Sequence, residues 1–191
     1  MQVAGLNLSA SLDLSATNLI FLELTAGLSL LAQIYGMGYL EKDWALARFF
    51  ALMGFFEGAI SGVILSSSLF STYFLLEMLT LSTYLLVGFW YAQPLVVTAA
   101  RDAFLTKRVG DVLLIAGPTG KCAQFPLHLW LDEAMEGPSP ASIMRNSVVV
   151  TCGAFVLIKI QPVVVLSPIT LDVLIAIGAI TAVGGSLVAL A

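Results

Sequence analysis

Long apolar runs alternate with short polar stretches along the chain. Four runs approach or exceed the roughly 20 apolar residues that cross a lipid bilayer: Asn18–Leu40, Ala47–Ser66, Leu69–Tyr91 and Leu171–Ala191. A fifth run, Ile143–Ile160, is just long enough. The pattern predicts an all-α, polytopic transmembrane helix bundle that forms a single membrane domain over residues 1–191.

Two further segments, Leu105–Ala116 and Lys121–Leu131, are too short to cross a bilayer alone. Because Pro126 has no backbone N–H, we expect the helix near Lys121–Pro126 to be kinked or broken. Broken helices are tolerated at membrane depth where they line a cavity or a water path. A lysine in such a place can act as a switchable proton carrier.

The composition agrees with a membrane protein and excludes other classes. Hydrophobic residues make up 59% of the 191 residues, charged residues make up 10%, and the mean hydropathy is +0.99. A net charge of −4 argues against nucleic acid as a partner. The N-terminus lacks the pattern of a signal peptide, so we expect the first helix to direct insertion. Cys122 and Cys152 lie inside or beside predicted spans, which favours free thiols over a disulfide.

The charged loops predict an orientation. The loop after the first span carries Lys42 and Arg48, whereas the turn after the second span is uncharged. The stretch after the third span is basic again, with Arg101, Lys107 and Arg108. By the positive-inside rule, we expect both basic loops to face the cytoplasm or the equivalent side of an internal membrane.

Three glutamates, Glu23, Glu57 and Glu77, lie within predicted spans, where an ionisable group needs a partner, a cavity or a function. Glu57 and Glu77 lie about ten residues on either side of a turn near Ser67–Ser68, so we expect them at the same depth, about 15 Å from it. Two carboxylates at one depth share a proton or a cation, which suits proton transport. Glu23 can equally be structural, and Glu57 and Glu77 can be satisfied by hydrogen bonds between helices.

The other charged and metal-ligating residues have plain structural interpretations. Arg145 and Lys159 lie near the two ends of the fifth span, where long basic side chains commonly reach back to the interface. His128 and Cys122 are only two candidate ligands, so we expect no zinc site made by this chain alone.

The stretch "GKCAQFPLHLWLDEAMEGPSPAS" combines a lysine in a broken helix, an A-Q-x-P-L-x-x-W-L pattern and a G-P-S-P stop. It resembles the antiporter-like membrane subunits of complex I and of Mrp-type antiporters. The resemblance extends through "IYGMGYLEKDWALARFF", "LLEMLTLSTYLLVGFWY" and "AARDAFLTKRVGD", and covers roughly residues 30–161. It is greatest with the subunit-5 type of NAD(P)H–quinone oxidoreductase.

This resemblance implies a proton-translocating, energy-coupling subunit. By position, Glu77 matches the glutamate of that family and Lys121 its proton-channel lysine. The expected partners are the other membrane-arm subunits and the lipid bilayer. No cofactor is expected in this chain, which contains no GxGxxG and no cysteine cluster, so iron–sulfur clusters and quinone belong to other subunits.

Three features depart from the family pattern. The family has a longer segment than this chain between about residues 112 and 121, which suggests a missing piece. Where the family has a relay histidine, this chain has Arg145 or Asn146, and an arginine cannot relay protons as histidine does. Glu57 stands where the family usually has an apolar or small residue.

These departures resemble the cyanobacterial variant in complexes specialised for carbon dioxide uptake. That variant implies a thylakoid membrane and a carbon dioxide hydration partner docked at the distal end, with any zinc held mainly by the partner. Glu57, together with Arg145 and Asn146, would then line a path or site for hydration or proton exit, and Glu57 could share in binding the zinc of the partner. Two alternatives are an Mrp-type cation/proton antiporter subunit and a non-pumping scaffold that docks a hydration protein.

Overall fold

The computed structural model describes the backbone of residues 2–3, 6–7, 11–112, 121–128, 130–131 and 137–190. Long α-helices account for most of this part of the chain: α1 (Ala16–Tyr39), α2 (Leu46–Leu65), α3 (Leu69–Val87), α4 (Pro94–Val112), α8 (Val150–Val164) and α9 (Pro168–Leu190).

Shorter elements connect or extend these helices: the 3-10 helix η1 (Gly88–Trp90), α7 (Ser139–Met144) and the π-helical turn η3 (Arg145–Val149). Because α7, η3 and α8 follow one another directly, they form one continuous helical span. At the N-terminus, the two-residue strands β1 (Gln2–Val3) and β2 (Leu6–Asn7) pair antiparallel.

The described residues contain five helices long and apolar enough to cross a membrane: Ala16–Tyr39, Leu46–Leu65, Leu69–Trp90, Ser139–Pro162 and Pro168–Leu187. Each corresponds to one predicted span, so the prediction of a polytopic helical bundle is confirmed. The fourth of these spans begins at Ser139, several residues before the predicted start. Arg145 therefore lies within the span rather than near its end.

The helix α4 differs from the sequence prediction. A short segment was expected at Leu105–Ala116, whereas the helix already begins at Pro94; residues 113–116 lie outside the described part. Proline is favoured at the first position of a helix, where its missing N–H costs nothing. A stripe of small and apolar residues then packs against the bundle: Val96, Ala99, Ala100 and Ala103. This one-sided stripe is too narrow to be recognised as a continuous apolar run.

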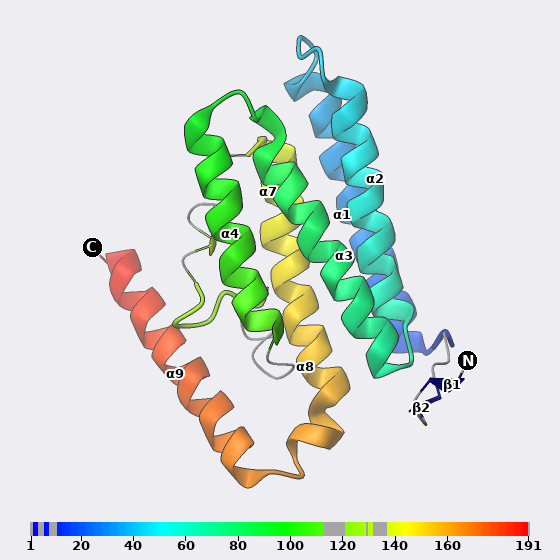
Figure 1. Cartoon of the computed structure of the whole chain (residues 1–191), viewed down its shortest axis with the longest axis vertical. Coiled ribbons are helices and arrows are strands. Elements are labelled where there is room, and N and C mark those ends of the chain that lie inside the picture. Colours follow the sequence, from blue (N-terminus) through cyan, green and yellow to red (C-terminus); the bar gives the residue numbers. More distant parts are fainter. Residues whose placement is uncertain are drawn as a thin grey trace.

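The long axes of α1–α4 and of the α7–η3–α8 span are roughly aligned, and α9 inclines away from them (Figure 1). The core centres on α2, which packs against both α1 and α3. One face of α2 is fully buried along its length at helical spacing: Phe49, Met53, Phe56, Ile60 and Val63. By contrast, α9 is exposed within this chain, and its hydroxyl at Thr181 accepts a hydrogen bond of 3.0 Å from the backbone N–H of Phe125.

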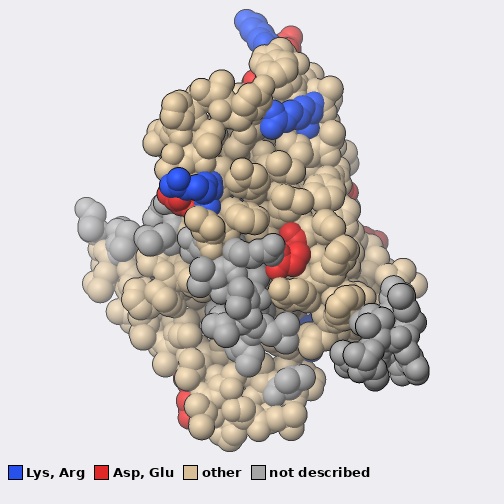
Figure 2. All heavy atoms as spheres, viewed as in Figure 1, with Lys and Arg blue, Asp and Glu red and all other residues tan. Residues whose placement is uncertain are grey.

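The α1–α2 loop, which carries Lys42, and the α3–α4 connection lie at the same end of the bundle, whereas the basic residues expected after the third span lie on α4 itself. The indole N–H of Trp90 donates to Asp43 Oδ2 at 2.9 Å, which ties the α3–α4 connection to the α1–α2 loop. Arg48 lies 5.0 Å from the ring centroid of Tyr91 in a cation–π contact. On the face seen in Figure 2, the Lys and Arg side chains lie mainly in the upper half, toward this end. The first three spans therefore alternate in direction, as expected from the sequence.

The same contacts act on the charge of Asp43, which lies in the loop outside the spans. The hydrogen bond from the Trp90 indole, and secondly that from the Ala45 backbone N–H, lower the pKa of Asp43 below its ordinary value of 3.8. Both donors stabilise the ionised carboxylate, so the link between the loops depends on its charge.

Candidate functional site

Lys121 has a helical backbone conformation and is followed directly by turns at Cys122 and Ala123, the latter with a φ of 52°. The described part of the segment thus contains the predicted break, which begins before Pro126 rather than at it. The acidic run at 132–136, part of the motif, lies outside the described residues. The break allows the Lys121 side chain to turn into the bundle.

The side chain of Lys121 is 1% exposed, and its Nζ donates a hydrogen bond of 2.6 Å to Thr80 Oγ1 on α3. Thr80 is itself fully buried, and its hydroxyl donates to the carbonyl of Leu76 at 3.0 Å. With its single hydrogen engaged there, the threonine oxygen is left to accept from the lysine. The fold therefore brings a lysine at a break next to a threonine on α3 that accepts its hydrogen bond.

Glu77 lies on α3 three residues before Thr80, which is one helical turn, or about 4.5 Å along the axis. Its side chain is partly buried. Thr83 continues the same face and donates from Oγ1 to the backbone oxygen of Thr80 at 2.7 Å. The structure thus brings Lys121 to the turn of α3 that follows Glu77, the two residues that the sequence predicted to act as a pair.

Glu57 faces a different helix. Its Oε2 accepts hydrogen bonds from Ser29 Oγ at 2.7 Å and from Gln33 Nε2 at 3.2 Å, both on α1. Gln33 also donates to Ser29 at 3.0 Å, which closes a three-residue network. This is the hydrogen bond between helices that was considered as the structural interpretation of Glu57. A shared proton or cation with Glu77 stays a prediction.

Arg145 is buried at 2% exposure at the start of the π-helical turn. Its Nη2 donates to Ser142 Oγ at 3.1 Å, whereas Nε and Nη1 have no hydrogen-bond partner among the described residues. The guanidinium therefore does not reach the interface, and the expected snorkelling is wrong for this residue. Asn146, the next residue, is half-buried. Glu57 contacts Ser29 and Gln33 on α1, whereas Arg145 contacts Ser142 on α7, so their described hydrogen bonds share no partner.

Lys159 reaches the end of a neighbouring span. Its Nζ donates to the backbone oxygens of Val63 at 3.2 Å and Ile64 at 2.9 Å, and also to that of Ser66. These are carbonyls at the C-terminal end of α2, where the helix leaves them without partners and carries partial negative charge. Lys159 on α8 is therefore a side-chain cap of α2, and it ties the two helices together.

The possible metal ligands are dispersed. Within the described ranges, no group of three or more His, Cys, Asp or Glu residues gathers in a way that could hold a metal ion. Cys122 and Cys152 are free cysteines, and the Cys122 thiol lies 3.6 Å from the carbonyl of Val150. His128 stacks on Phe125 with 5.8 Å between ring centroids, and its Nδ1 has no partner among the described residues.

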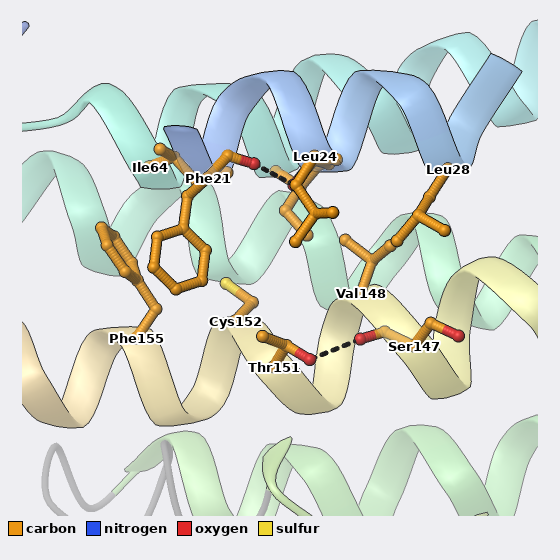
Figure 3. A pocket seen from close by; sticks show the side chains of 11 residues that line it. Phe21, Leu24, Leu28, Ile64, Ser147, Val148, Thr151, Cys152 and Phe155 are labelled. Atoms are coloured by element: carbon orange, nitrogen blue, oxygen red, sulfur yellow. Dashed lines mark hydrogen bonds between the residues drawn. The ribbon is translucent and has the colours of Figure 1, made fainter. Parts of the chain in front are cut away.

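An apolar groove of about 360 Å³ lies between α1, α2 and the η3–α8 segment (Figure 3). Phe21, Leu24 and Leu28 face Val148 and Phe155 across it. None of the charged residues Glu57, Glu77 and Lys121 lines this groove. Two of its hydroxyls, on Thr25 and Thr151, bond to carbonyls of their own helices, so they offer no ready anchor for a polar ligand.

A buried lysine at a break beside a glutamate-bearing helix is also found in the part of the chain that matches a known family. The model of the family "NADH:quinone oxidoreductase/Mrp antiporter, TM" matches residues 66–120 and 113–191. The chain belongs to this family. The model for the N-terminus of complex I chain 5 also matches residues 1–50. The family match covers the helices that carry Glu77, Lys121 and Arg145.

Individual relatives point to the same subunit type. The chain is 63% identical, over 98% of its length, to the protein named "NAD(P)H-quinone oxidoreductase subunit 5, organellar chromatophore 2" of Paulinella chromatophora. It is 33% identical, over 90% of its length, to the chloroplastic NAD(P)H-quinone oxidoreductase subunit 5 of Lobularia maritima. The chain spans only 37% and 29% of the lengths of these two relatives.

Several residues that contact Lys121 or Glu57 were not singled out from the sequence. Thr80, Ser29 and Gln33 are polar residues within spans, and such residues commonly bond across helices. Thr80 follows Glu77 by one turn, and Ser29 and Gln33 are one turn apart on α1. That spacing was a usable signal, because residues one turn apart share a helix face.

Proposed function

We propose that this chain is a proton-translocating, energy-coupling membrane subunit of an NAD(P)H–quinone oxidoreductase, in which Glu77 and Lys121 form the proton-transfer pair. The observation that carries this proposal is the 2.6 Å hydrogen bond from the buried Lys121 ammonium to Thr80, one turn from Glu77. Membership of the family and the names of the relatives support it.

The physical chemistry of the site suits proton transfer. A charged lysine at membrane depth is costly unless it has a hydrogen-bond acceptor, and a lysine can exchange its proton, unlike an arginine. Thr80 supplies an acceptor for the ammonium, and Glu77 adds an ionisable group on the same helix face. A change in the charge of one group then biases the other, because charges interact more strongly in a low-dielectric interior than in water.

Oxidation and reduction would take place in other subunits, and this chain would contribute proton movement only. We further propose that a family segment is missing between about residues 112 and 121. The family model matches in two pieces that overlap there, at 66–120 and 113–191. The alignment with the Paulinella relative also runs over 228 residues, which is longer than the 191 residues of this chain.

The test is proton translocation by the assembled complex carrying Glu77→Gln, reconstituted in liposomes. We expect fewer protons to cross per electron delivered to quinone, with assembly unchanged. Glu23→Gln is the matched control, because Glu23 also lies in a span and its side chain is exposed within this chain. Unchanged translocation in an assembled Glu77→Gln complex would contradict the proposal and favour the scaffold alternative.

We also propose that the chain belongs to a complex specialised for carbon dioxide uptake, located in a photosynthetic membrane and docked to a hydration partner. Three residues that depart from the family pattern support this: Glu57, Arg145 and Asn146. The location is supported by the names of two relatives, which assign them to a chromatophore and to a chloroplast.

Carbon dioxide uptake in cells carrying Glu57→Gln tests this specialisation, with assembly and quinone reduction checked alongside. Loss of uptake with both retained would support a role of Glu57 in hydration or proton exit. Unchanged uptake would leave Glu57 as a structural link to Ser29 and Gln33, whatever the result for Glu77.

A further inference from the structure

The guanidinium of Arg145 is a buried charge without a compensating partner in the described structure. An arginine stays protonated in proteins, so it cannot lose its charge when it is buried. Only Nη2 is engaged, by the neutral hydroxyl of Ser142 at 3.1 Å. Leaving a buried charge uncompensated is strongly destabilising, so two bare donors, Nε and Nη1, require an explanation.

The surroundings of Arg145 provide a place for an acceptor. A narrow hollow lies between α3, α4 and the segment after the break, and Arg145 lines it with Thr83, Tyr84 and Trp130. No carboxylate is among the described residues that line this hollow. The Tyr84 hydroxyl can donate to a ligand or accept from one, whereas the Thr83 hydroxyl already donates to the Thr80 carbonyl. Among the described residues, the lining of the hollow therefore contains a positive charge and a free hydroxyl donor but no carboxylate.

Aromatic rings close the hollow. The rings of Tyr84 and Phe104 lie 5.3 Å apart between centroids, from α3 and α4 respectively. With the rings in this position, the hollow is too narrow for a water molecule. Tyr84 is 37% exposed within this chain, so part of its side chain lies at the surface of the bundle. A ligand would thus enter between α3 and α4 when one ring moves aside.

We propose that Arg145 binds a small monovalent oxyanion in this hollow, admitted past Tyr84 and Phe104. A guanidinium edge matches a planar oxyanion, because two N–H groups can donate to two oxygens in parallel. Nε and Nη1 lie on opposite edges of the guanidinium, so the anion occupies one edge, and a second acceptor such as water serves the other. The site is separate from the proton-transfer proposal, since Lys121 and Glu77 are not among its lining residues.

Nitrate is a suitable probe, because it is small, planar and monovalent. The purified, assembled complex is heated in nitrate or in gluconate, a bulky anion, at equal ionic strength, and the midpoint of its dissociation is measured. We expect a saturable rise of the midpoint in nitrate, since a ligand that binds only the native state stabilises it. Arg145→Gln should lose this nitrate-dependent rise.

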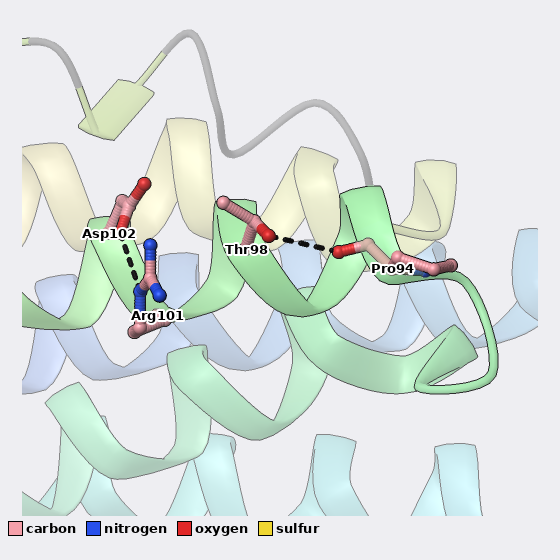
Figure 4. A network of polar contacts seen from close by, with 4 residues as sticks. All are labelled: Pro94, Thr98, Arg101 and Asp102. Atoms are coloured by element: carbon pink, nitrogen blue, oxygen red, sulfur yellow. Dashed lines mark hydrogen bonds and ion pairs between the residues drawn. The ribbon is translucent and has the colours of Figure 1, made fainter.

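Arg101→Gln is the matched control. Arg101 is an exposed arginine on α4 whose Nε donates to Asp102 at 2.9 Å, one turn from Thr98 (Figure 4). Its replacement should leave the nitrate effect intact. An equal rise in the Arg145→Gln complex would place nitrate elsewhere, and no difference between nitrate and gluconate in the unaltered complex would overturn the proposal.

A second measurement covers the case in which Arg145→Gln fails to assemble. Cryo-electron microscopy of the unaltered complex in nitrate and in gluconate should reveal density beside Nε or Nη1 in nitrate only. A carboxylate oxygen of a neighbouring subunit at both edges, in both conditions, would refute the proposed site, because the charge would then be compensated by protein.

Discussion

Replacing Thr80 with valine removes the hydroxyl that accepts from Lys121 and keeps the shape of the side chain. The lost hydrogen bond joins a charged donor to a buried acceptor at 2.6 Å, and both side chains are 1% exposed. Hydrogen bonds to charged groups contribute about 1.5–3 kcal/mol. This corresponds to a factor of about 10 to 100 in an equilibrium or a rate. We expect the rate of proton translocation to fall by about tenfold or more.

The assay is proton uptake by liposomes that contain the assembled complex, measured together with the rate of quinone reduction. Thr25→Val is the matched control, because Thr25 is also buried in a span, yet its hydroxyl bonds to the Phe21 carbonyl of its own helix. The reasoning is refuted if Thr80→Val and Thr25→Val complexes translocate protons at the same rate and with the same ratio of protons to electrons.

Three further predictions concern the bundle itself. Lys159→Met should destabilise the chain by about 2 kcal/mol, because it uncaps the end of α2, and the midpoint of thermal or denaturant unfolding measures this. Because the pKa of Asp43 is lowered in the folded state, its bond to Trp90 contributes stability above about pH 4 that is lost as the pH falls further; Asp43→Asn should remove that dependence in unfolding measured against pH. Gly137→Ala should reduce stability, since a Cβ there would lie 3.2 Å from backbone atoms at the end of α3.

Matched controls separate these effects from general damage. Lys42→Met removes an exposed ammonium and should leave the unfolding midpoint unchanged. Gly54→Ala adds a Cβ that meets no atom within 4 Å, so it should be neutral or slightly stabilising. If Lys159→Met behaves like Lys42→Met, or Gly137→Ala like Gly54→Ala, then the cap or the close packing contributes little. A pH dependence that survives in Asp43→Asn would assign it to other groups.

The five spans could be predicted because hydropathy reports directly on the bilayer. Local signals set their ends: Ser15 and Ser68 each accept a hydrogen bond from a backbone N–H of the first turn of α1 and α3 respectively. The helix α4 was underestimated, because its apolar residues form one stripe rather than a continuous run. The break near Lys121 could be expected from Pro126, although the chain leaves the helix earlier.

The partners of the charged residues could not be predicted. Lys159 caps carbonyls on α2, far away in sequence, and Glu57 bonds to two residues of α1. Position relative to a span end suggested that Lys159 reaches toward an interface, whereas the particular carbonyls that it bonds are decided by how α8 packs against α2. The pairing of Lys121 with α3 followed from the family resemblance, whereas Thr80 as its acceptor came only from the folded arrangement.

The central claim is that Lys121 carries protons. The most direct test is the number of protons translocated per electron by the assembled, reconstituted complex with Lys121→Met, which keeps the apolar stem and removes the ammonium. The account predicts fewer protons per electron, with assembly and quinone binding retained. An assembled Lys121→Met complex that translocates as many protons per electron as the unaltered complex would contradict it.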